Sequence, residues 1–164
     1  MPTQKPRFNI ADVVNGILID VGEVLAERKE DRYFEEIVLI YSTIENVLKW
    51  LIFLKAMWGR HAPQFSEPAV ESNRKFCRQL SFNDAERMAL MLGIIDYDFY
   101  KRVDAARNER NDIIHQFWRD AHRGNNLQLR RKLEELDSIF GDLILSMNEF
   151  LNEIGNEEVL YIRL

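Results

Sequence analysis

The sequence predicts an all-α protein, an up-and-down bundle of four to five main helices. Its 164 residues include only seven Gly and four Pro, too few chain breakers for a fold with many tight turns. Long stretches repeat apolar residues at three- and four-residue steps, as one face of a helix requires. Apolar residues make up 46% of the chain and charged residues 30%, a balance typical of a soluble globular domain. We therefore expect a flexible N-terminal arm over residues 1–8 and a single helical domain over residues 9–164.

Apolar periodicity and its interruptions define the expected helices. They cover residues 10–25, 33–58, 69–80, 83–92, 97–122 and 127–154. The apolar stripe on the 33–58 helix is too wide for a helix with only one buried side. Because this stretch also carries Glu45, Lys49 and Lys55, we expect a core helix and not a membrane span.

Capping residues and a glycine mark the ends of the later helices. Asn83 is placed to cap the helix that follows it, with Glu86 three residues on in the position of a capping box. Gly93 is expected to end that helix, because glycine is favoured just past a helix terminus. Asp96 or Asp98 can then cap the next helix.

Charge is distributed unevenly along the chain. The formal net charge is −5, which weighs against a broadly basic coat for nucleic acid. Residues 101–132, however, contain nine Lys/Arg and four Asp/Glu. Residues 133–164 contain one Lys/Arg and eight Asp/Glu. The first stretch could hold a phosphate backbone locally, or the helices could simply segregate charge. Both interpretations stay open at this point.

Cysteine content and the N-terminus bear on location. Cys77 is the single cysteine, which excludes an internal disulfide and a cysteine-based zinc cluster. No hydrophobic leader follows Met1 and Pro2, so we expect a cytoplasmic protein without a membrane segment.

Polar side chains that can do chemistry concentrate in residues 107–118. Arg107, Asn111 and His115 lie four residues apart, so they form one polar stripe on a helix. Arg110 stands five residues before His115, about 140° round the helix, and must curl its side chain to reach the same place. Burying such a polar cluster costs free energy unless its groups have hydrogen-bond or ion-pair partners or take part in function. The cluster is therefore the candidate functional site.

The pattern Arg110-Asn111, three residues, His115 resembles the signature of the HEPN superfamily. The resemblance covers residues 33–152 and includes the preceding helix, its terminal glycine and an acidic connector over residues 84–96. It implies that two chains pair with their motif helices together and build one cleft from two Arg/His sets. In active members of the family this cleft cuts RNA without a metal.

The resemblance implies roles for individual residues. Arg110, His115 and Asn111 are the expected catalytic residues, and Arg107 and Arg119 are expected to bind the RNA substrate. A histidine can serve as the general base on a ribose 2′-hydroxyl. An arginine can clamp the phosphate and stabilise the charge that develops on it, while Asn111 orients the histidine or binds the backbone. No cofactor is expected.

The expected partners are a second copy of the chain, an RNA substrate, and an antitoxin or nucleotidyltransferase. Many HEPN toxins have a tyrosine two residues after the histidine, which a partner nucleotidyltransferase modifies. Phe117 stands at that position here and lacks the hydroxyl.

Two alternatives remain open from the sequence alone, and a third, a metal site, is not favoured. The chain could be a catalytically silent HEPN dimer that binds RNA, a nucleotide or a protein. Arg110 and His115 could instead be structural, with Arg110 bonding a glutamate of the 33–58 helix and His115 satisfied at a dimer interface. His115 and His122 share a face, but only Asp112 or Asp120 could supply a third ligand, so no metal is expected.

Overall fold

The computed structural model describes residues 16, 19, 22, 33–58, 67–120 and 126–153. Within these ranges the side chains of residues 58, 67, 114, 116–120, 126–128 and 153 are not described. The expected arm over residues 1–8 lies outside the described residues. So does most of the helix expected over residues 10–25, although the three residues described there have helical backbone.

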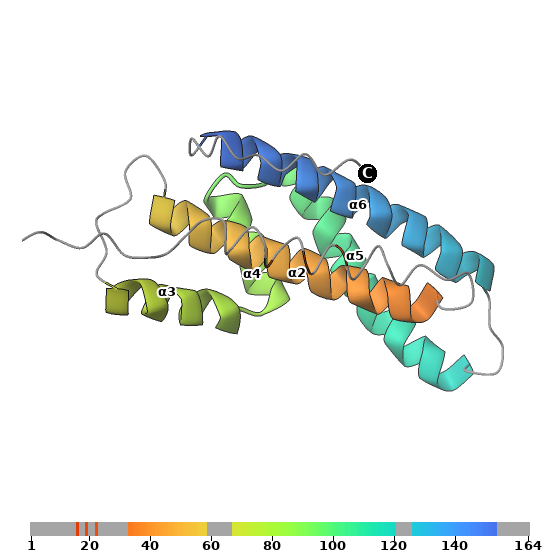
Figure 1. The fold of residues 1–164 in the computed structure, drawn as a ribbon. Coiled ribbons are helices and arrows are strands. Elements are labelled where there is room, and N and C mark those ends of the chain that lie inside the picture. Colours follow the sequence, from red (N-terminus) through yellow and green to blue (C-terminus); the bar gives the residue numbers. More distant parts are fainter. Residues whose placement is uncertain are drawn as a thin grey trace, which may run out of the picture.

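The described chain is an all-α bundle, as predicted (Figure 1). Its helices are α2 (Tyr33–Trp58), α3 (Glu67–Gln79), α4 (Phe82–Met91), α5 (Tyr97–Asp120) and α6 (Asn126–Glu153). The bounds of α2 agree with the prediction. The helix α3 begins two residues before the predicted start and includes Pro68, since proline is tolerated in the first turn, where its missing N–H has no helical partner.

The helix α2 lies at the centre of the bundle, in contact with α3, α4 and α6 (Figure 1). This arrangement explains its wide apolar stripe, because side chains on several sides of the helix are covered. Residues that are 0% exposed include Val47, Leu48, Leu51 and Leu54. By length and composition α2 is also the one described helix that could cross a membrane, but 61% of the relevant window is buried inside the bundle. Its burial accords with the predicted core helix of a soluble protein.

The N-cap predicted for α4 is wrong. Ser81, not Asn83, caps this helix: its backbone is extended, and its Oγ accepts a hydrogen bond of 3.2 Å from the backbone N–H of Asp84. The earlier start brings Phe82 into the first helical position, where its side chain is buried in the core. Glu86 therefore falls in the second turn, inside the bundle, and does not close a capping box.

The connector between α4 and α5 follows the prediction. Gly93 has a φ of +66°, a left-handed conformation that glycine adopts without strain. Of the two candidate caps for α5, Asp96 is the one used, since its Oδ1 accepts a 2.7 Å hydrogen bond from the backbone N–H of Phe99. This tight connection directs α5 back along α4.

Two leucines of α6 test the packing of the core. Leu136 is 0% exposed and Leu145 is 61% exposed. We expect Leu136→Ala to lower the free energy of unfolding by about 3 kcal/mol, because it removes apolar contacts and leaves a cavity. Leu145→Ala, the matched control, should change it by less than about 0.5 kcal/mol. Urea denaturation followed by circular dichroism measures both, and equal losses would contradict the assigned core.

Candidate functional site

The motif helix α5 packs against α4 and α6 and is tied to α2 at the level of Arg110. The Tyr41 hydroxyl donates a hydrogen bond to the backbone carbonyl of Ala106, one turn before Arg110. The guanidinium carbon of Arg110 lies 5.9 Å from the centre of the Tyr41 ring. Burial raises the pKa of Tyr41, Glu135 raises it further and Arg110 opposes the rise, so the hydroxyl stays protonated and remains a donor.

Arg110 is half-buried, and part of its guanidinium group is unsatisfied. Its Nε is buried and has no hydrogen-bond partner among the described residues. No described carboxylate pairs with it, so the alternative in which it bonds a glutamate of α2 is not what the structure shows. Buried donors almost always have a partner. The acceptor for this donor on an arginine of the motif therefore has to come from outside the described residues.

Arg107 occupies a different environment from Arg110. Its Nε donates a 2.9 Å hydrogen bond to Oε1 of Glu86 on α4, and its terminal nitrogen pairs with Asp104 one turn earlier. Glu86 is 0% exposed, and its second oxygen, Oε2, has no hydrogen-bond partner among the described residues. The arginine expected to bind substrate is thus engaged in an ion pair that joins α5 to α4.

Burial raises the pKa of Glu86 to about 7, with the hydrogen bond and charge of Arg107 opposing the rise. The nearby Asp104 adds to it, because a second negative charge disfavours ionisation. The carboxyl group therefore changes its protonation state near neutral pH inside the bundle.

Asn111 and His115 are exposed on α5, and neither has a hydrogen-bond or ion-pair partner within the described ranges. The predicted stripe is therefore divided. Arg107 contacts α4 and Arg110 contacts α2, whereas Asn111 and His115 face outward. The side chain of Arg119 lies outside the described residues, as do those of Phe117 and His122.

Much of the basic stretch over residues 101–132 is neutralised within the chain. Its described ion pairs, beyond those of Arg107, are Arg102–Asp142 at 2.5 Å, Arg130–Glu134 at 3.2 Å, and Lys132 with both Glu109 and Glu135. Two of these pairings connect α5 to α6. For these residues the structure favours charge segregation and pairing between neighbouring helices over an open phosphate-binding surface.

Within the described residues, no group of three or more His, Cys, Asp or Glu side chains lies together in a way that could hold a metal ion.

Comparison of the chain with protein-family models, with curated proteins and with solved structures finds no match.

Two residues that support the site were not identified as such from the sequence. Glu86 was assigned to a helix cap, although it lies on the same face as the apolar positions Phe82, Ala85 and Ala89, at helical spacing. That spacing could have indicated a buried carboxylate in need of a cation. Tyr41 lies on the apolar stripe of the 33–58 helix, and nothing in the sequence distinguishes its hydroxyl as a contact to α5.

The raised pKa of Glu86 predicts a pH-dependent stability. The folded protein keeps the proton on the Glu86 carboxyl group up to about pH 7, whereas the unfolded chain releases it near pH 4.5. The contribution of this protonation to the free energy of unfolding is therefore fully present below pH 4.5. It is lost as the pH rises through 7. Glu86→Gln removes the titration, so the free energy of unfolding of the variant, relative to wild type, should rise by on the order of 2–3 kcal/mol between pH 4.5 and 7.5.

Urea denaturation across this pH range measures the difference. Glu71→Gln is the matched control, because the Glu71 side chain is 67% exposed, and it should follow wild type. A difference between Glu86→Gln and wild type that stays constant with pH would show that Glu86 does not titrate in this window.

Proposed function

We propose that this chain is a HEPN-type, metal-independent endoribonuclease of prokaryotic defence, toxin activity or stress response, acting in the cytoplasm. Its Arg/His site is completed at a homodimer interface. The observation that carries the proposal is the buried Nε of Arg110, which has no described acceptor although it lies in a helical Arg-Asn-x3-His motif. A phosphate oxygen of RNA supplies such an acceptor.

A second copy of the chain supplies what one copy lacks. Within one chain Arg110 lies over Tyr41, while Asn111 and His115 are exposed on α5. In a two-fold dimer the same surface of both copies meets, and in the pairing that the HEPN resemblance implies this surface includes α5, so the exposed residues of one α5 face those of the other. The His115 of one copy then approaches the Arg110 of the second, and the cleft between the copies contains two sets of Arg110 and His115.

The proposed reaction is a transesterification at phosphorus. His115 takes the proton of the 2′-hydroxyl as the 2′-oxygen forms a bond to phosphorus. The bond from phosphorus to the 5′-oxygen breaks, and that oxygen takes a proton from the second copy's His115 or from water. The products are a 2′,3′-cyclic phosphate and a 5′-hydroxyl, and Arg110 stabilises the charge that builds on the phosphate oxygens.

The remaining motif residues have supporting roles in this proposal. Asn111 orients His115 or binds the RNA backbone, and Arg119 contacts phosphate. Arg107 would have to leave Glu86 to reach substrate. While paired, it acts as a positioning residue that fixes α5 on α4.

A second candidate is a catalytically silent HEPN dimer that binds RNA, a nucleotide or a protein. The intramolecular pairing of Arg102, Arg107, Arg130 and Lys132 favours it, because these cations are not available to an RNA backbone as they stand. On either proposal an antitoxin or nucleotidyltransferase could bind the chain, although Phe117 offers no hydroxyl to modify.

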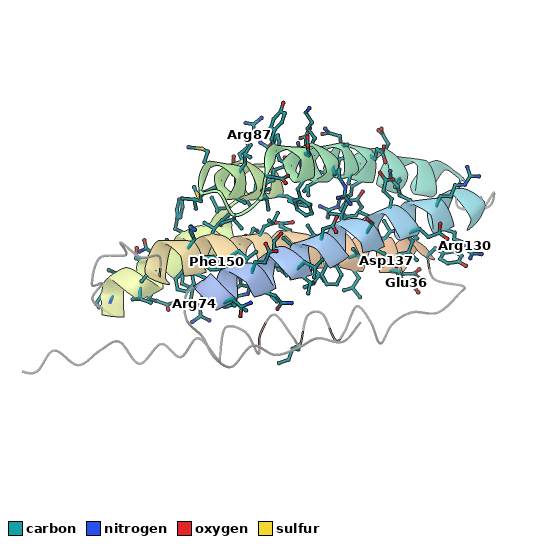
Figure 2. All side chains as sticks on the ribbon, turned by 90° about the horizontal axis from the view of Figure 1, so that it is seen from above. Glu36, Arg74, Arg87, Arg130, Asp137 and Phe150 are labelled. Carbon is teal, nitrogen blue, oxygen red and sulfur yellow. The ribbon has the colours of Figure 1, made fainter. Side chains whose placement is uncertain are left out.

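RNA cleavage in the presence of EDTA tests the first candidate. We expect wild type to cut a structured RNA, His115→Ala to lower the initial rate by roughly 10²–10⁴-fold, and Arg110→Ala to lower it by roughly 10²–10³-fold. Arg87→Ala is the control, because Arg87 is exposed on α4 and projects away from the bundle (Figure 2). Intact RNA with wild type, or equal cutting by all variants, would leave the silent dimer as the better account.

A mixing experiment tests whether the site is shared between two chains. Light scattering should give a mass about twice the 19.5 kDa of one chain. Mixing Arg110→Ala with His115→Ala should restore roughly a quarter of the wild-type rate, because half of the dimers are mixed and each keeps one of the two Arg110–His115 pairs, with water as the proton donor. A monomer, or a mixture as inactive as its components, would argue that each chain acts alone.

A further inference from the structure

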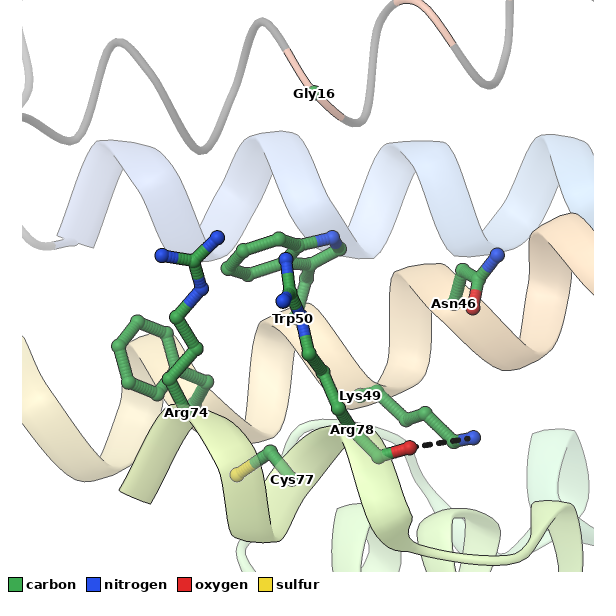
Figure 3. A pocket seen from close by; sticks show the side chains of 8 residues that line it. Gly16, Asn46, Lys49, Trp50, Arg74, Cys77 and Arg78 are labelled. Carbon is green, nitrogen blue, oxygen red and sulfur yellow. Dashed lines mark hydrogen bonds between the residues drawn. The ribbon is translucent and has the colours of Figure 1, made fainter. Parts of the chain in front are cut away.

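A cavity of about 310 Å³ lies between α2 and α3, apart from the motif (Figure 3). The helix α3 and the C-terminal end of α5 lie at opposite ends of the bundle in both views (Figures 1 and 2). The cavity is lined by Gly16, by Asn46, Lys49, Trp50 and Phe53 of α2, and by Arg74, Cys77 and Arg78 of α3. The described lining therefore contains three cationic side chains and no carboxylate.

Trp50 organises the two arginines of the cavity. The guanidinium carbons of Arg74 and Arg78 each lie 5.8 Å from the centre of its ring (Figure 3). Trp50 is itself held by an edge-on contact with Phe53, with ring centres 5.9 Å apart. Guanidinium groups that rest on an aromatic ring lose little freedom when they bind an anion. The pair is thus positioned before any ligand arrives.

The positive charge of the cavity is only partly compensated. Lys49 pairs with Glu45 at 2.6 Å, and Arg74 lies 3.7 Å from Glu71, whose side chain is 67% exposed. For Arg78 the described part of the chain provides no carboxylate within ion-pair distance. Neither glutamate lines the cavity. The charged side chains in the described lining are therefore all positive.

The cavity lining also includes the uncharged side chains of Phe53 and Cys77. Cys77 is 5% exposed, and burial raises the pKa of its thiol, so the sulfur remains protonated and does not act as a nucleophile. Phe53 and Cys77 thus add apolar surface to a lining that also contains Lys49, Arg74 and Arg78. A lining with both cationic and apolar side chains suits a small molecule with one charged end.

We propose that this cavity binds a small phosphomonoester, with its phosphate between Arg74 and Arg78 and its body against Trp50 and Cys77. A phosphomonoester carries a charge of about −1.5 to −2 at neutral pH, which two guanidinium groups match. A carboxylate or a phosphodiester carries only a single charge. Since small-molecule sites span roughly 300–1,000 Å³, a cavity of 310 Å³ selects a ligand of about sugar-phosphate size.

Calorimetric titration of the full chain tests the proposal with three probes. Ribose 5-phosphate should bind in the micromolar to low-millimolar range, inorganic phosphate should bind more weakly, and ribose should not bind. Arg78→Ala should weaken the binding of ribose 5-phosphate at least tenfold, and the Arg74→Ala, Arg78→Ala double variant should abolish it. Arg78→Lys should recover only part of the loss, because an ammonium group cannot form the bidentate contact.

Arg87→Ala is the matched control, an exposed arginine on α4 that does not line the cavity. It should bind ribose 5-phosphate as wild type does. The proposal is overturned if neither phosphate probe binds, if ribose binds as well as its phosphate, or if Arg78→Ala and Arg87→Ala behave alike. Arg78 is exposed, so its variants should fold, and their thermal unfolding curves check this.

Discussion

The structure depends on the burial of α2. This helix has apolar side chains on most of its circumference, and a helix of that kind is stable in water only when other helices cover it. The helices α3, α4 and α6 do so, and each is amphipathic because it has only one side to bury. The bundle is therefore built outward from α2, and α5 is attached mainly through α4 and α6.

The attachment of α5 uses polar contacts at selected points. Tyr41 bonds to the backbone of Ala106, and the buried carboxyl group of Glu86 bonds to Arg107. Buried ion pairs contribute little net stability, because desolvation offsets their attraction, but removing one partner leaves an uncompensated charge. Their effect here is on register: if α5 slid by one turn, Glu86 would lose its only described cation, and Arg107 would keep only Asp104 of its own helix. Arg110 is thereby held at a fixed position over Tyr41.

The fold could be predicted well from the sequence because its signals are local. The bounds of α2, the glycine after α4 and the cap at Asp96 all follow from residues within a few positions of each other. The error at Asn83 arose because two residues near the start of α4 can both cap, and the burial of Phe82 decided between them. That burial depends on the other helices and is not visible in the local sequence.

The candidate site was less predictable for the same reason. Helical spacing placed Arg107, Asn111 and His115 on one stripe, but spacing does not give the length or the neighbours of a side chain. Arg107 turns to Glu86, twenty-one residues away in sequence, and Arg110 turns to Tyr41 on another helix. The cavity between α2 and α3 was also not foreseen, since Trp50, Arg74 and Arg78 come together only where α3 packs against α2.

The central position of α2 also has a consequence for synthesis on the ribosome. The most apolar helix of the bundle emerges early, whereas α6, which covers much of its length, is made last among the described helices. During that interval the nascent chain exposes a segment with the composition of a membrane span. Such a segment is prone to aggregate or to bind chaperones until α6 has been synthesised and packs against it. The burial that stabilises the finished protein thus makes its unfinished form vulnerable.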